Sequence, residues 1–223
     1  MFLLKKDEMP RGCFIVFCGL DGSGKSTLLQ GVRLWLDRLN IHHTQGRHPP
    51  EEWLNDSAIY GKYVLGKKEA AVDDYYEVDF TCGLRRKFQP KIITDLYQKK
   101  VILYHRYIFS LFTYYSATKT VELDYISKQS ACLLRPDLVF YCRIGADVFY
   151  KRARKRGLLP FQKSEEHVLA MIDQYDSFAQ DPNWITIDTE NCDPEESLQN
   201  CLRELQRYQF HESLFDMRGR KID

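Results

Sequence analysis

The chain has 223 residues, of which 44% are hydrophobic, and its formal net charge is +1. This length and apolar content are those of one ordinary folded domain and exclude global disorder, while the near-neutral charge argues against a nucleic-acid partner. The seven scattered cysteines form no C-x-x-C pair and no apolar run reaches a membrane-spanning length, so we expect a cytoplasmic protein with reduced thiols and no membrane contact.

A glycine-rich loop, GLDGSGKST at 19–27, follows directly after the predicted first strand at 13–18. The spacing G-x-x-x-x-G-K-S is that of a phosphate-binding loop, in which glycines allow backbone N–H groups to approach an anion closely. Lys25 can reach the β- and γ-phosphates, the Ser26 hydroxyl can ligand Mg²⁺, and the helix that follows aims its N-terminal dipole at the same charge. We therefore predict a site for a nucleoside triphosphate and Mg²⁺ that uses the following loop residues: Gly19, Asp21, Gly22, Ser23, Gly24, Lys25, Ser26 and Thr27.

Strand-like runs and helical patterns alternate along the rest of the chain. Further strands are predicted at 42–48, 101–105, 138–144 and 184–188. Helices are predicted at 25–39, 56–67, 72–99 with interruptions, 107–118, 122–134, 147–156, 164–179 and 194–208. Such alternation predicts an α/β fold with a parallel five-stranded sheet and helices on both faces, in which ligands bind at the carboxyl ends of the strands.

Two further strand ends carry cations that suit phosphate. His105, Arg106 and Tyr107 end the strand VILYH and begin the next segment. The Arg106 guanidinium can bind an acceptor phosphate there, and a structural ion pair is the alternative. The basic run KRARKRG at 151–157 can close as a lid over the transferring phosphoryl group, and a solvated helix face is the alternative.

The sequence leaves the roles of four other polar residues more open. Arg85 and Arg86 lie on a predicted helix, where they can reach an acceptor or face solvent. Asp21 places a negative charge inside the phosphate loop, so we expect it to have a dedicated partner such as a sugar hydroxyl. Asp137 precedes a predicted strand, and we interpret it as a cap or turn residue.

Taken together, these pieces resemble the thymidylate kinase family of P-loop nucleoside monophosphate kinases, of which the chain would be a divergent member. The resemblance extends over about residues 13–207. It rests on the order and spacing of six segments: FCGLDGSGKST, GRHPP, LRRKFQPKI, VILYHRYIFSLFTYYSA, RPDLVFYCRI and KRARKRG. It implies the three-layer sandwich of the P-loop NTPases, with a kinase domain at 12–209, a lid at about 151–163, an N-terminal extension at 1–11 and a C-terminal tail at 210–223.

The resemblance also implies roles for individual residues. Lys25, Ser26 and Thr27 would serve ATP and Mg²⁺, and Asp21 would lie near the deoxyribose 3′-hydroxyl of the acceptor. Because position 22 is glycine, the catalytic arginine of the family would come from the lid, as Arg152 or Arg156. The arginines implied in acceptor binding are Arg85 at the base, Arg106 at the phosphate and Arg47 near that phosphate. The family also implies a homodimer.

The chain departs from the family pattern at three places. His105 stands where the family has an aspartate that organises Mg²⁺ and the transferring group, so a neutral imidazole, a poor Mg²⁺ ligand, takes its place among the catalytic candidates. The aromatic residue that stacks on thymine aligns with Thr81, and a shift of one residue would give this role to Phe80. Tyr115 occupies the position of a pyrimidine-reading glutamine and is a further candidate for acceptor binding.

The leading hypothesis is therefore a nucleoside monophosphate kinase of nucleotide biosynthesis that converts dTMP to dTDP with ATP. Thr81 and Tyr115 keep open a P-loop kinase with a different small-molecule acceptor. His105 keeps open a nucleotide-binding module with weak or no catalysis.

Overall fold

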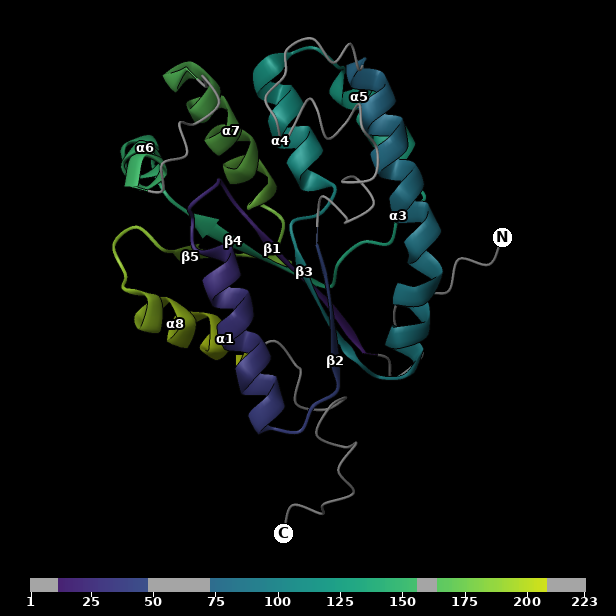
Figure 1. Cartoon of the computed structure of the whole chain (residues 1–223), viewed down its shortest axis with the longest axis vertical. Helices are drawn as coiled ribbons and strands as arrows, with labels where there is room; N and C mark the ends of the chain where they lie inside the picture. Colours follow the sequence, from purple (N-terminus) through teal and green to yellow (C-terminus); the bar gives the residue numbers. More distant parts are fainter. Residues whose placement is uncertain (1–11, 48–72, 156–163, 208–223) are drawn as a thin grey trace.

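The computed structural model describes residues 12–47, 73–155 and 164–207, and five strands within these ranges form one parallel sheet (Figure 1). The strand order is β2-β3-β1-β4-β5, which places the strand before the glycine-rich loop in the centre. This confirms the predicted α/β fold. The strands are β1 Cys13–Cys18, β2 His43–Arg47, β3 Val101–His105, β4 Leu138–Arg143 and β5 Trp184–Asp188.

The described helices agree with the predicted pattern except on the long segment and at the end of the helix predicted at 122–134. They are α1 Lys25–Arg38, α3 Asp74–Tyr97, α4 Phe109–Thr118, α5 Leu123–Ser130, α6 Ala146–Lys155, α7 Glu165–Phe178 and α8 Pro194–Arg207. The predicted interruptions of 72–99 are wrong, because α3 continues through Pro90. Pro90 removes one backbone donor from the helix. This loss is tolerated because buried side chains before and after Pro90, Cys82 and Ile92, hold α3 in the apolar core. The helix predicted at 122–134 ends at Ser130.

Some sequence predictions lie outside the described residues. These are the extension at 1–11, the helix at 56–67, the lid beyond residue 155 with Arg156, and the tail at 210–223. Among the helices that are described, none is both long and apolar enough to cross a membrane.

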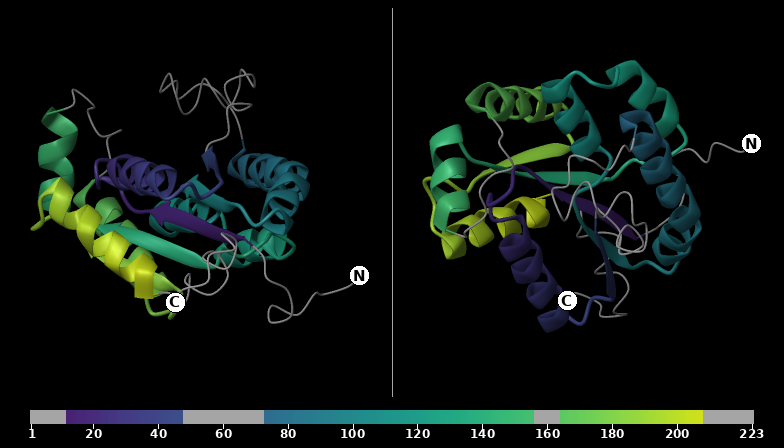
Figure 2. Two further views of the ribbon diagram at one scale, coloured as in Figure 1. Left: turned by 90° about the horizontal axis from the view of Figure 1, so that it is seen from below. Right: turned by 45° about the horizontal axis from the view of Figure 1, so that its top comes forward.

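The alternation of side chains along β1 divides the core into two layers. Phe14, Val16 and Cys18 pack into the larger apolar cluster with α3, α4 and α7. Ile15 and Phe17 belong to the second cluster, which α1 and α8 cover. The two clusters place α3, α4 and α7 on one face of the sheet and α1 and α8 on the other, and both views of Figure 2 show α3 and α8 at opposite sides of the molecule. Helices therefore cover both faces of the sheet, as predicted.

The parallel register brings the carboxyl ends of the strands to one edge. Phe17 of β1 and Arg47 of β2 both pair with His105, the last residue of β3. At the opposite edge, Asp137 accepts a hydrogen bond from the backbone N–H of Phe14 at 2.9 Å. Asp137 thus fixes the start of two neighbouring strands, which confirms the structural role expected for it.

Candidate functional site

The loop after β1 has the backbone conformation that its glycines predict. Gly19, Gly22 and Gly24 have φ angles of 134°, 78° and 87°. These angles belong to the region that side chains with a Cβ rarely adopt. A Cβ on Gly19 would also lie 2.4 Å from the backbone oxygen of Cys142 in β4. The loop is therefore pressed against the neighbouring strand, and its conformation depends on glycine.

Lys25 begins α1 and points back into the loop. Its Nζ donates hydrogen bonds to the backbone oxygen of Leu20 at 2.5 Å and to Ser23 Oγ at 3.4 Å. Burial, followed by repulsion from Arg106, lowers the pKa of Lys25 to about 7. Ser26 and Thr27, the next two residues of α1, are exposed, whereas Ser23 in the loop is buried. A triphosphate in the loop would restore the full charge of Lys25 and replace its carbonyl partner.

His105 lies directly beside the predicted metal ligand. Its Nε2 is 3.2 Å from Ser26 Oγ, so the last residue of β3 reaches the first turn of α1. Burial, together with the positive charges of Lys25 and Arg106, lowers the pKa of His105 to about 4. The imidazole is therefore neutral at pH 7 in the protein without a ligand.

Arg106 has a left-handed backbone and a charged partner. Its φ is 65°, and its N–H donates to the backbone oxygen of Phe17 at 2.9 Å, which extends the ladder between β3 and β1. Its Nη2 donates to Asp21 Oδ1 at 2.5 Å. Burial opposes the charge of Arg106, but Asp21 raises its pKa overall. Asp21 thus has a dedicated partner, as expected, and in the structure this partner is Arg106.

Arg152 brings α6 to the same loop. Its guanidinium donates to the backbone oxygen of Gly22 at 3.0 Å and to that of Thr189 at 2.5 Å. Thr189 also donates from Oγ1 to the backbone oxygen of Ser23 at 2.8 Å, which connects the end of β5 to the loop. The sequence analysis missed Thr189, although its position directly after a predicted strand was a usable signal. The other cations of this run that the structure describes are exposed: Lys151, Arg154 and Lys155.

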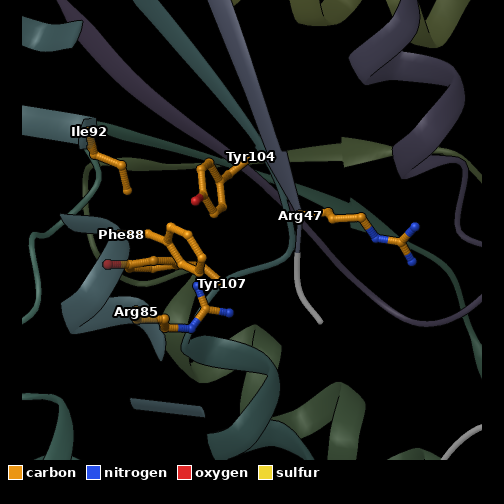
Figure 3. A pocket seen from close by; sticks show the side chains of 6 residues that line it. All are labelled: Arg47, Arg85, Phe88, Ile92, Tyr104 and Tyr107. Carbon is orange, nitrogen blue, oxygen red and sulfur yellow. The ribbon is translucent and has the colours of Figure 1, made fainter. Parts of the chain in front are cut away.

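A second cluster, the Arg85 pocket, lies between α3 and β3 (Figure 3). Arg85 is 6% exposed, and its Cζ lies 4.4 Å from the ring centre of Tyr107. Within the described part of the chain, its Nε and Nη2 have no hydrogen-bond partner. Burial lowers the pKa of Arg85. The residues that line the pocket are Arg47, Arg85, Phe88, Ile92, Tyr104 and Tyr107.

The sequence analysis did not identify Tyr104 and Phe88 as site residues. Tyr104 occupies space that a glycine in β2 leaves open, since a Cβ on Gly46 would lie 2.1 Å from its ring. That glycine in a predicted strand was the available signal, because a strand glycine often marks a close approach. Arg47 ends β2 with an exposed side chain, and Figure 3 shows its guanidinium pointing away from Arg85.

Two predicted acceptor residues lie away from this pocket. Tyr115 is 1% exposed, and its hydroxyl lies 2.6 Å from Glu77 Oε2 in the core, so the contact of Tyr115 with a base stays a prediction that this position does not favour. Phe80 is half-buried and stacks on Tyr76, one helical turn earlier, with ring centres 5.9 Å apart. An α-helix turns about 100° per residue, so Phe80 points away from the face of α3 that carries Thr81 and Arg85. A shift of one residue therefore does not bring Phe80 into the Arg85 pocket.

The geometry suits a nucleotide with its phosphates in the loop. The described residues contain no group of three or more histidine, cysteine, aspartate or glutamate side chains that could hold a metal by themselves. A divalent cation would therefore take most of its ligands from phosphate oxygens and water, with Ser26 Oγ as an oxygen donor from the protein. Lys25, Arg106 and Arg152 place positive charge around the same volume.

Comparisons with known proteins agree with this arrangement. The model of the thymidylate kinase family matches residues 17–200. A probable thymidylate kinase 2 of Saccharolobus solfataricus is 23% identical over 195 residues, which cover 80% of this chain and 88% of the relative. The crystal structure of the thymidylate kinase of Ehrlichia chaffeensis aligns with 87% of this chain and 98% of its own, at 24% identity and a TM-score of 0.64. The structure of the thymidylate kinase from Candida albicans aligns with 91% of this chain and 94% of its own, at 19% identity and a TM-score of 0.71.

Proposed function

The chain belongs to the thymidylate kinase family and is a nucleoside monophosphate kinase of that type, and we propose that it transfers the γ-phosphoryl group of ATP to dTMP, giving ADP and dTDP. In this reaction an oxygen of the acceptor phosphate forms a bond to Pγ, and the bond between Pγ and the β,γ-bridging oxygen breaks. Catalysis of such a transfer consists mainly of positioning and of stabilising charge on the phosphoryl oxygens. The site residues divide between these two tasks.

The donor side is built around the loop. The backbone N–H groups at 19–27 and Nζ of Lys25 would hold the β- and γ-phosphates. Arg152 already donates to the loop backbone at Gly22, so a small movement of its guanidinium would bring it to the phosphoryl oxygens. Arg156, which lies outside the described residues, stays a prediction for the same role.

The acceptor side is built around two arginines, the half-buried Arg106 and the buried Arg85. Arg106, fixed at the end of β3 and oriented by Asp21, would hold the acceptor phosphate beside the loop. Arg85 has unpaired N–H donors that would bind the base, with the aromatic rings of Phe88 and Tyr104 against it. Arg47 would lie near the acceptor phosphate. When Arg106 turns from Asp21 to the acceptor phosphate, the Asp21 carboxylate would lie close to the deoxyribose of the acceptor.

Mg²⁺ is the divalent cation that we propose for the ATP complex. Ser26 Oγ supplies the protein oxygen, and the phosphates and water would supply the rest, which suits the preference of Mg²⁺ for oxygen. The cation neutralises developing charge on the phosphoryl oxygens. His105 Nε2 is the neighbouring donor that does not fit this preference.

One observation carries the proposal: cations from the segments that follow three different strands lie around one phosphate loop. Lys25 follows β1, Arg106 follows β3 and Arg152 follows β4, and each forms hydrogen bonds to loop atoms. A module that only binds a nucleotide needs Lys25 alone, but transfer between two phosphates needs positive charge beside both the donor and the acceptor phosphate. This favours a kinase over the module without catalysis.

The test is ADP release by the purified protein with ATP and Mg²⁺ across a panel of deoxyribo- and ribonucleoside monophosphates, with Lys25→Ala as the blank. We expect the highest kcat/KM with dTMP. Turnover of another nucleotide in preference to dTMP would reject dTMP as the acceptor and retain the kinase activity. Bound ATP without turnover of any acceptor in the panel would reject both the dTMP acceptor and the kinase activity.

We also propose that the protein acts as a homodimer in the cytoplasm, since its family membership supports both. Light scattering coupled to size exclusion would give the mass of the particle in solution. A mass of one chain at catalytic concentrations would reject the dimer. Cell fractionation would test the location.

A further inference from the structure

Two donor atoms from different elements meet beside the phosphate loop. Ser26 Oγ belongs to the first turn of α1, and His105 Nε2 belongs to the last residue of β3. The two atoms lie 3.2 Å apart and share a hydrogen bond, which metal binding would replace. The nearby Asp21 carboxylate is held by Arg106. The pair therefore offers one oxygen and one nitrogen to the volume that the terminal phosphates would occupy.

The separation of these atoms fits two ligands of one octahedral metal ion. For metal–ligand distances of about 2.1 Å, adjacent corners of an octahedron lie about 3.0 Å apart. The two donors match this edge within a few tenths of an ångström. Only small side-chain adjustments would be needed for both atoms to contact a cation bound to ATP.

The chemistry of the pair differs from that of an oxygen-only site. Mg²⁺ prefers oxygen ligands, whereas imidazole nitrogen suits transition-metal ions, and their affinity rises from Mn²⁺ to Co²⁺. We infer that His105 and Ser26 together ligand the nucleotide's divalent cation, and that the site therefore prefers a transition-metal–ATP complex, such as that of Co²⁺, over Mg²⁺–ATP. This inference rests on the proposed nucleotide site. It changes which cation serves that site and leaves the reaction as proposed.

Electron spin-echo spectroscopy of the Mn²⁺–ATP complex tests the ligand directly and requires no turnover. Protein labelled with ¹⁵N-histidine should show a ¹⁵N coupling to Mn²⁺, and His105→Asn should abolish it. His43→Asn is the matched control. His43 is the first residue of β2, so it lies at the amino ends of the strands, away from His105, and it pairs with Asp37 at 2.8 Å. The coupling should persist in that variant.

Competition between Co²⁺–ATP and Mg²⁺–ATP, measured by calorimetry, tests the preference. Even loss of a group that only orients a metal ligand lowers metal affinity by about 10–100-fold. Loss of a ligand itself, in His105→Asn, should therefore lower the preference for Co²⁺–ATP over Mg²⁺–ATP at least about tenfold. His105→Asp, which supplies an oxygen, should shift the preference toward Mg²⁺.

The outcomes separate the inference from the proposed function. Bound Mn²⁺–ATP without ¹⁵N coupling in the wild-type protein would overturn the inference while dTMP-dependent ADP release retains the kinase. A wild-type preference for Co²⁺ that His105→Asn leaves unchanged would also overturn it. Failure of the protein to bind ATP with any of the three cations would reject the inference and the proposed nucleotide site together.

Discussion

The arginines and the lysine of the phosphate loop region differ from Arg85 in one respect. Around the loop, Lys25, Arg106 and Arg152 all form hydrogen bonds to other atoms of the protein. In the Arg85 pocket, two donor nitrogens of a buried guanidinium have no partner in the described part of the chain. The loop cations can exchange internal partners for phosphate oxygens. Arg85 instead has unsatisfied donors before any ligand binds.

This difference has an energetic consequence. Exchange of one hydrogen bond for another changes the folding free energy little, whereas a buried donor without a partner costs about 1–3 kcal/mol. The stacking of Arg85 on Tyr107 recovers part of that cost. The loop residues are thus compatible with a stable protein without ligand, but the Arg85 pocket reduces stability in exchange for binding. Substitutions on the two sides should therefore affect activity and stability in different proportions.

The largest effect is expected at Lys25. Lys25→Ala removes the cation that reaches the β- and γ-phosphates, so kcat/KM for ADP release should fall about 10³-fold or more. Removal of the buried ammonium relieves its desolvation cost but leaves the backbone oxygen of Leu20 without this donor, so the melting temperature of the protein without ligand should change little. Coupled-enzyme kinetics and thermal unfolding would measure the two quantities. A decrease in activity that merely follows a loss of folded protein would contradict this assignment.

Arg106 should come next, with an effect on the acceptor. Arg106→Gln removes the guanidinium proposed to hold the acceptor phosphate and should lower kcat/KM for dTMP about 100-fold. Arg106→Lys is the matched variant, since it retains the charge and loses the planar fork, and it should recover only part of the loss. The affinity for ATP, measured by calorimetry, should change less than about threefold in both variants. An equal loss of ATP affinity would place Arg106 on the donor side instead.

Arg85 should show the opposite combination of effects. Arg85→Met should raise KM for dTMP about 10-fold or more, because donors proposed to bind the base are lost. The same change should increase the free energy of unfolding by about 1 kcal/mol, since the unpaired buried donors are removed. Arg86→Met is the matched control on the same helix, because Arg86 is exposed and donates to the backbone oxygen of Gln129 at 2.9 Å.

The two Arg85 measurements test separate parts of the comparison. Denaturant unfolding would give the stability, and steady-state kinetics would give KM. If Arg85→Met destabilises the protein without ligand, the pocket does not carry the energetic cost that we assign to it. If KM for dTMP stays at the wild-type value, Arg85 does not bind the acceptor.

The two sides also differ in how well the sequence predicted them. The loop residues are contiguous, and the spacing of Gly19, Gly24 and Lys25 defines their geometry locally, so Lys25 and Ser26 could be assigned directly. The end of β3 was predictable as well, because parallel strands end at one edge. The state of Arg85 was not, since it packs against the ring of Tyr107, which follows β3 and reaches α3 only after the chain has folded.

Tyr115 shows why alignment with a family pattern was insufficient on the second side. Its position on α4 matched a base-reading residue, but a phenol is larger than an amide and fills the space toward α3. There its hydroxyl contacts Glu77 Oε2 and lies 3.2 Å from the backbone oxygen of Asp74. Sequence spacing gives the position of a side chain on a helix. It does not give the partner that the side chain finds across the core.

Tyr115→Phe gives the smallest expected effect on activity. The change removes the hydroxyl that contacts the buried Glu77 carboxylate, so the free energy of unfolding should fall by about 1–3 kcal/mol. The ratio of kcat/KM values for dTMP and dUMP should stay within about twofold of the wild type, because no atom that reads the base has been altered. A tenfold change in that ratio with unchanged stability would instead place Tyr115 in the acceptor site. Base selection would then extend from the Arg85 pocket to α4, and the division between binding residues and core residues would have to be redrawn.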